Sequence, residues 1–185
     1  MHAAVDTTLL LRTARGDEAA ARTLWTLMGS RLVALARGLL RGAGGDAAAM
    51  DVVQTVLCRV LTLDRASLAE VQDAEAWLAR AVRNESLNYH RAVHRRRGHE
   101  PRALMERHGA GAGLGELEGA LGELPEGLRE IVLLKHAAGL TFDQIALSLG
   151  DNRSTVASRY AKALKLLRAW GAEREERGRR VEVLR

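Results

Sequence analysis

The sequence predicts an all-α protein with two small helical domains joined by a flexible glycine-rich linker. Three observations support this fold class. The 185 residues include only two prolines and 3% aromatic residues, whereas alanine and leucine are abundant. Apolar residues recur at the spacing of amphipathic helices through most of the chain. Clustered glycines interrupt that spacing over residues 98–122. A chain of this length can form one or two domains with a real core.

The first domain is predicted to span residues 1–97 and to begin with a short helix near residues 6–15. Asp17 is a suitable N-cap for a long helix that ends at about Leu40. Its apolar face consists of Leu24, Met28, Leu32, Leu35 and Leu39. The glycine-rich segment 41–46 is expected to end this helix, because clustered glycines are poor helix formers.

Two further helices are predicted to complete the first domain. Asp46 is expected to cap one whose apolar residues repeat with strong amphipathic spacing up to Leu61. A polar loop is expected at roughly residues 64–72. Asp73 then caps a long helix that ends near Arg97.

The second domain is predicted to span residues 123–172, after the linker 98–122, in which a short helical stretch is expected from Leu114. It begins with a helix at about 126–138 and continues into a helix-turn-helix. The remaining tail, 173–185, is highly charged and is expected to fray.

The helix-turn-helix is predicted over residues 141–165. Thr141 and Gln144 have the spacing of a capping box, which marks the start of a helix. Gly150 would end that helix, since glycine adopts the left-handed conformation at little cost. Asn152 is a suitable cap for the next helix.

The second helix of this motif has two different faces. An apolar stripe follows the helical period through Val156, Tyr160, Ala163, Leu164, Leu167 and Trp170. Small and basic residues lie opposite it, namely Ser154, Ser158, Ala161, Lys162 and Lys165. Such a face suits a helix that meets phosphates and base edges, so the pattern favours DNA binding over a helical hairpin with a merely solvated basic face.

A second basic surface is predicted on the helix that follows Asp73. Its buried stripe consists of Trp77, Leu78, Ala81, Val82, Tyr89 and Val93. The residues off this stripe include Arg80, Arg83, Asn84, Arg91 and Arg95. Arginines bind phosphates in a forked geometry and Asn can bond a base edge, so nucleic-acid contact is favoured over a solvated charged face. Glu85 lies close to the stripe and is expected to pair with a nearby arginine.

The composition narrows the classes of protein to which the chain could belong. A net charge of +5 suits a polyanionic partner, although charge alone would also fit a membrane surface. The single cysteine, Cys58, excludes an internal disulfide framework and fits the reducing cytoplasm. No secretory signal and no membrane span is predicted.

Catalysis and metal binding are not expected. His90, His94 and His99 are closely spaced, but zinc needs three or four placed ligands and the neighbouring residues are basic. The sequence has no phosphate-binding loop, nucleophile elbow or convincing pair of carboxylates. We therefore predict a protein that is not an enzyme and that uses no metal and no cofactor.

The chain as a whole resembles the extracytoplasmic function (ECF) sigma factors of bacterial RNA polymerase. Four segments are similar, in order, to the blocks of that family: GDEAAARTLW at 16–25, DAAAMDVVQTVLCRVL at 46–61, AWLARAVRNESLNYHRAVHRRR at 76–97, and LPEGLREIVLLKHAAGLTFDQIALSLGDNRSTVASR at 124–159. The resemblance implies that the first domain binds core RNA polymerase and opens the minus-ten element of a promoter. It implies that the second domain reads the minus-thirty-five element.

The resemblance also implies roles for individual residues. Asp51, Val53 and Gln54 match the core-binding segment of the family. Arg80, Arg83, Asn84 and Arg91 match its promoter-melting helix, which Arg95 continues. The recognition helix and its phosphate contacts would involve Arg153, Ser154, Thr155, Ser158, Arg159 and Lys162. The chain departs from the family pattern at Ala47–Ala49, where acidic residues are usual, and at Asp151, Ala157 and Glu85.

Three functions remain open at this point. The leading one is a promoter-specificity subunit that acts on core polymerase, with promoter DNA as its other partner. The second is a stand-alone helix-turn-helix regulator, and the third is a degenerate homologue that works as an interaction protein. Family members are often held inactive by an anti-sigma factor, which is therefore a further candidate partner.

Overall fold

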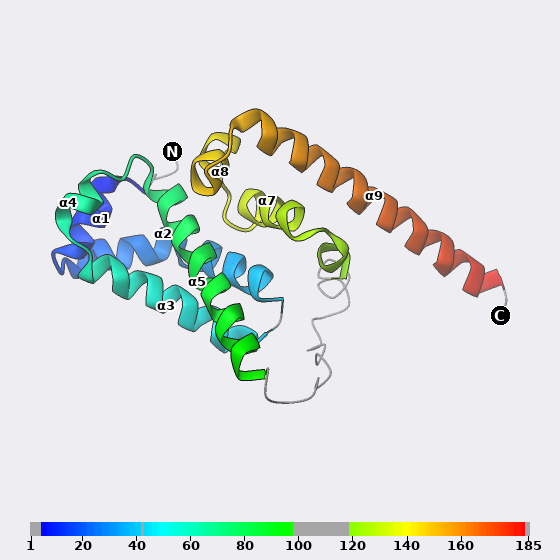
Figure 1. The fold of residues 1–185 in the computed structure, drawn as a ribbon, viewed down its shortest axis with the longest axis horizontal. Coiled ribbons are helices and arrows are strands. Elements are labelled where there is room, and N and C mark those ends of the chain that lie inside the picture. The colour runs from blue at the N-terminus through cyan, green and yellow to red at the C-terminus, as the bar shows by residue number, and fades with distance from the viewer. Residues whose placement is uncertain (1–4, 42, 98–118, 184–185) are drawn as a thin grey trace.

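All regular secondary structure in the described part of the chain is helical, as predicted. The structure is a computed structural model, and it describes residues 5–41, 43–97 and 119–183 (Figure 1). The helices of the first domain are α1 (Thr7–Ala14), α2 (Glu18–Leu40), α3 (Gly45–Thr62), α4 (Arg65–Ala69) and α5 (Ala74–Arg97). Those of the second domain are α7 (Glu126–His136), α8 (Phe142–Leu149) and α9 (Arg153–Val183).

Side-chain caps start several helices where the sequence predicts them. Asp17 Oδ1 accepts a hydrogen bond from Ala20 N at 3.0 Å, at the start of α2. Asp73 Oδ1 accepts one from Ala76 N at 2.8 Å, at the start of α5. These bonds satisfy amide groups that have no partner within the first turn of a helix.

The start of α3 differs from the prediction that Asp46 caps it. The N-cap is Gly44, with φ of 79°, and no side chain bonds the first-turn amides there. Because glycine tolerates the left-handed conformation, the helix starts two residues earlier than expected, and Asp46 lies inside its first turn. Its carboxylate instead contacts Arg37 Nε at 2.7 Å.

The region predicted as a polar loop at 64–72 contains the short helix α4. Asp64 caps it by accepting hydrogen bonds from Ala66 N at 3.2 Å and from Ser67 N at 3.4 Å. Leu68 is fully buried and anchors α4 in the first domain. A helix of five residues is too short for its apolar period to be recognised in the sequence.

The predicted helix-turn-helix is confirmed in its local details. Thr141 N donates to Gln144 Oε1 at 2.9 Å, and Gln144 N donates to Thr141 Oγ1 at 3.2 Å, which completes the capping box of α8. Gly150 ends α8 with φ of 71°. Asn152 Oδ1 accepts from Thr155 N at 2.8 Å, in the first turn of α9.

The charged tail differs from the expectation that it frays, because α9 continues as far as Val183 (Figure 1). Glutamate and arginine are good helix formers, and the segment contains no proline to stop the helix. The guanidinium of Arg174 lies over the Trp170 ring, 5.3 Å from its centre. Of the predicted linker, residues 98–118 lie outside the described residues, whereas 119–122 are helical.

One apolar core runs through both domains. Leu32, Leu78 and Val82 of the first domain belong to the same buried cluster as Leu134 and Ile145 of the second. Accordingly, α7 lies against α2, and α8 lies against α5 (Figure 1). The two domains are therefore packed together in this structure.

Candidate nucleic-acid and polymerase interfaces

The predicted recognition helix presents its polar residues to solvent. Five of the six predicted residues of α9 are exposed and Thr155 is half-buried; the exposed ones are Arg153, Ser154, Ser158, Arg159 and Lys162. Val156, on the opposite side, is fully buried against the core. The polar face is therefore held outward by packing of the apolar stripe beneath it.

Aromatic contacts attach α9 to the two helices that precede it. Tyr160 packs edge-on against Phe142, with ring centres 5.3 Å apart. Its hydroxyl is hydrogen-bonded to His136 Nε2 at 2.8 Å. These contacts join α9 to both α7 and α8.

Two arginines of this face are paired with acidic neighbours. Arg153 Nε lies 3.3 Å from Asp143 Oδ1, at the start of α8. Arg159 Nη1 lies 2.7 Å from Asp151 Oδ2, in the turn. Asp151 is one of the departures from the family pattern, and it orients the guanidinium of Arg159 at the edge of the turn. Both pairs are exposed enough that each contributes little to stability.

Two residues of the predicted strand-binding face of α5, Arg80 and Arg83, lie at the contact between the domains. Arg80 Nε donates to Ser148 O at 2.8 Å, and its Nη2 donates to Leu147 O, both at the end of α8. Arg83 donates from Nε and Nη2 to the two carboxylate oxygens of Glu130 on α7.

The other predicted residues of α5 lie outside this contact. Asn84, Arg91 and Arg95 are exposed. Arg91 Nη1 donates to Asn88 Oδ1 at 3.2 Å within the same helix. The structure thus separates the five predicted residues into two that contact the second domain, of which Arg80 is itself exposed, and three that make no such contact.

The sequence did not predict a functional role for the other residues at the contact between the domains. Arg31 of α2 donates from Nε to Ala138 O at 2.7 Å, and from Nη2 to Glu75 at 3.0 Å. Gln144 Nε2 donates to Asp73 Oδ2 at 3.0 Å. Asp73 and Gln144 were predicted only as caps of their own helices, and a single sequence does not show that the two caps meet.

Glu85 has the partner that was expected of it. Its Oε2 lies 3.1 Å from Arg59 Nη2 on α3, so the carboxylate near the apolar stripe is paired. His90, one of the three histidines considered above, has Nε2 within 3.0 Å of Leu39 O. The side chain of His94 and all of His99 lie outside the described residues.

The predicted polymerase-binding residues of α3 differ in exposure. Asp51 and Gln54 are exposed, whereas Val53 is fully buried. Val53 can therefore support this surface but cannot touch a partner, which corrects the role that the resemblance implies for it. A one-residue step along a helix turns the side chain by about 100°, so adjacent residues of a matched segment reach different environments.

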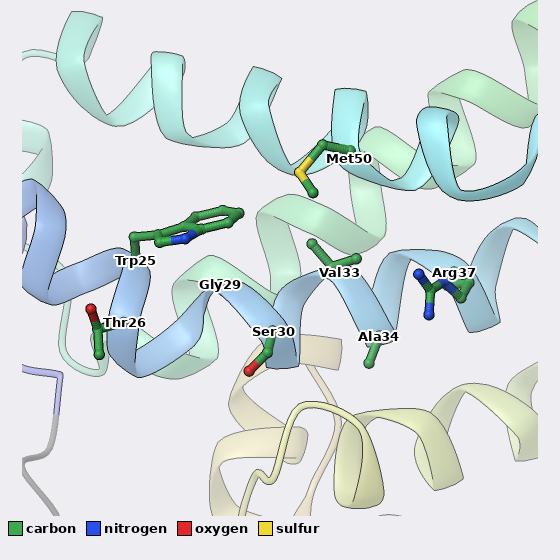
Figure 2. A pocket seen from close by; sticks show the side chains of 8 residues that line it. All are labelled: Trp25, Thr26, Gly29, Ser30, Val33, Ala34, Arg37 and Met50. Atoms are coloured by element: carbon green, nitrogen blue, oxygen red, sulfur yellow. The ribbon is translucent and has the colours of Figure 1, made fainter.

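An open groove lies beside this surface, between α2 and α3. Trp25, Val33, Arg37 and Met50 line it (Figure 2). Trp25 is 43% exposed, and its ring covers Gly29, where a Cβ atom would come 2.7 Å from the ring. Glycine at this position thus allows the indole to lie flat against α2.

Burial perturbs one cation of the second domain. Arg129 on α7 is 6% exposed, and its Nε has no hydrogen-bond partner. Desolvation lowers the pKa of its guanidinium, although an arginine remains charged in proteins. Within the described residues, no cluster of His, Cys, Asp or Glu side chains could hold a metal ion. No helix in that part of the chain is long and apolar enough to cross a membrane.

Comparison with solved structures shows the same fold. The structure of CnrH in complex with the cytosolic domain of CnrY matches with a TM-score of 0.66 and 24% identity, over 91% of this chain and 97% of that one. The sigma factor RpoE in complex with the anti-sigma factor NepR from Bartonella quintana matches with a TM-score of 0.63 and 23% identity. That match covers 82% of this chain and 96% of RpoE. No curated protein sequence matches the chain.

Two family models match consecutive parts of the sequence. The model described as Sigma-70 region 2 matches residues 24–97, which contain α3 and α5. The model described as Sigma-70, region 4 matches residues 114–167, which contain the helix-turn-helix. Both regions occur in the order that the sequence predicts. The chain therefore belongs to the sigma-70 family and is a sigma factor of the ECF type, not an enzyme.

Proposed function

We propose that this sigma factor binds core RNA polymerase and directs initiation at promoters whose two elements are read by its two domains. The second domain reads the minus-thirty-five element as duplex DNA through α9. The first domain binds and opens the minus-ten element through the basic face of α5. The observation that carries this proposal is the exposed polar face of α9, which two caps and a buried stripe hold in place.

Polymerase binding is assigned to the exposed side of α3. Asp51 and Gln54 lie on that side, while Val52 and Val53 face the core. Of the alanines at 47–49, where the family usually has acidic residues, Ala48 and Ala49 are buried and only Ala47 is exposed. The surface around Asp51 therefore lacks at most one charge through these departures. An anti-sigma factor is a further proposed partner, since the similar RpoE structure contains one.

Run-off transcription with core polymerase on a genomic promoter library tests the proposal. We expect new transcripts from a limited set of promoters only when both the protein and core enzyme are present. A pull-down of core polymerase with the purified protein, and with an Asp51→Ala/Gln54→Ala variant, provides the control. Binding of duplex operators without any retention of core polymerase would instead support the stand-alone regulator.

A further inference from the structure

Arg129 of α7 is a buried cation that has no partner within the described part of the chain. It is 6% exposed, and its Nε atom makes no hydrogen bond to the described residues. None of the acids among those residues forms an ion pair with it. A guanidinium keeps its charge in a protein, and a buried charge without a partner is strongly unfavourable. The burial of Arg129 therefore indicates an anion that comes from outside the described residues.

The two acids closest to Arg129 along α7 do not supply that anion. Glu130 gives both of its carboxylate oxygens to Arg83. Glu126 is exposed. Burial, followed by the charge of Arg41, lowers the pKa of the Arg129 guanidinium, and these two effects outweigh the opposing charges of Glu126 and Glu130. The surroundings of Arg129 are therefore unfavourable for its positive charge.

Arg41 comes to the same place from the first domain. Leu133 of α7 packs directly over Gly38 of α2, where an added Cβ atom would overlap with it. Arg41 lies three residues after Gly38, and Arg129 lies four residues before Leu133, so each arginine is about one helical turn from this contact. The two helices run in opposite directions (Figure 1), which puts both arginines on the same side of it.

The guanidinium of Arg41 has donors to spare and space beside it. Arg41 ends α2 with φ of 51°, in the left-handed conformation that usually falls to glycine at this position of a helix. Its Nη2 donates to Gly122 O at 3.3 Å, which is its only hydrogen bond to the residues that the structure describes. A Cβ atom on Gly122 would meet nothing within 4 Å except that Nη2, at 3.9 Å. Arg41 is exposed, so this side of the contact is accessible from solvent.

We propose that Arg41 and Arg129 bind one phosphate-type oxyanion, either inorganic phosphate or the phosphate group of a nucleotide. A phosphate carries up to two negative charges and has several acceptor oxygens, so a single group can accept forked hydrogen bonds from both guanidinium groups. A small anion suits the site better than a nucleic-acid backbone, because Arg129 is buried. The site belongs to neither basic face of α5 and α9, and it does not depend on the proposed function. Since each domain provides one arginine, the anion would link the end of α2 to α7.

Three variants of the full-length chain test the site. Arg129→Met removes the buried charge and keeps an extended side chain, and an apolar residue in place of a buried ion is often tolerated. Arg41→Asn removes the second charge, and asparagine tolerates the left-handed conformation. Arg22→Gln is the matched control, because Arg22 is an arginine of α2 whose side chain is 72% exposed.

Binding is measured by isothermal titration calorimetry at constant ionic strength, with chloride as the background anion. The probes are inorganic phosphate, adenosine monophosphate, adenosine triphosphate and, as a ligand without phosphate, adenosine. We expect one phosphate site per chain in the unaltered protein, with affinity at least tenfold weaker in Arg129→Met and in Arg41→Asn. The affinity of Arg22→Gln should stay within about twofold, as expected for a surface change remote from the site.

Thermal unfolding gives an independent measurement. At a phosphate concentration ten times the dissociation constant, the Tm of the unaltered protein should rise by about 3–6 °C, and the rise should level off as the site fills. Phosphate also stabilises proteins by exclusion from their surface, but that effect does not saturate and should be equal in all variants. The saturable part of the rise should therefore disappear in Arg129→Met and Arg41→Asn.

The ligands distinguish the two sources of the phosphate group. Similar affinities for inorganic phosphate and adenosine monophosphate, without binding of adenosine, would support a site for phosphate alone. At least tenfold tighter binding of either nucleotide would support a nucleotide site. The proposal would be overturned by the absence of saturable binding of all three phosphate-containing ligands, by unchanged affinity in either arginine variant, or by an equal loss in Arg22→Gln. If Arg129→Met did not fold, Arg41→Asn would still decide, because Arg41 is exposed.

Discussion

The basic faces of α5 and α9 carry similar residues but have different surroundings. On α9, Arg153 pairs with the exposed Asp143 of α8 and Arg159 pairs with the half-buried Asp151 of the turn, and the face remains open to solvent. On α5 two arginines contact the end of α8 and a partly buried acid of α7. The difference shows that packing decides whether a basic helical face contacts another part of the protein or remains open to solvent.

We expect the largest effect from a substitution in the core that supports both basic faces. Ile145 is fully buried in the core that supports α9 and the domain contact, so Ile145→Ala should lower the free energy of unfolding by about 2–5 kcal/mol. Urea denaturation followed by circular dichroism measures this. Leu147→Ala is the control, because Leu147 is on the same helix but 41% exposed. Equal losses in the two variants would contradict the assigned core.

An intermediate effect should distinguish the two faces. Arg80→Ala leaves the carbonyls at the end of α8 without their donor and should destabilise the protein by about 1 kcal/mol. Arg153→Ala removes only an exposed pair and should change stability by less than about 0.5 kcal/mol. Thermal unfolding of both variants side by side tests this difference. A reversed order would mean that Arg80 is not a structural cap.

The smallest effect concerns α9 alone. Lys162→Ala should weaken binding to duplex promoter DNA and reduce the slope of log affinity against log salt by about one unit, if Lys162 contacts one phosphate. Anisotropy titrations at several salt concentrations measure the slope. Arg168→Ala, an exposed residue further along α9, is the control and should leave the slope unchanged. An unchanged slope in Lys162→Ala would exclude that phosphate contact.

Local structure followed closely from local sequence. The capping box of Thr141 and Gln144, the left-handed Gly150 and the Asn152 cap all depend on residues within a few positions of each other, and all were predicted. The predictions that proved wrong also concerned local structure. Asp46 is not the cap because the two glycines before it adopt left-handed conformations that other residues adopt only rarely, and α4 is too short to show a helical period. The pairing of Glu85 was expected, but its partner Arg59 was not identified.

The sequence by itself determined the helical fold class, the two basic faces and the family. Amphipathic periods, helix caps and sequence motifs depend on residues that lie close together in the sequence. Only the tertiary structure decided that Val53 is buried, that the caps Asp73 and Gln144 meet, and that Arg80 and Arg83 are occupied by the second domain. These facts depend on contacts between residues tens of positions apart. Such contacts are set by how preformed helices bury their apolar faces, and one sequence read along its length does not contain that arrangement explicitly.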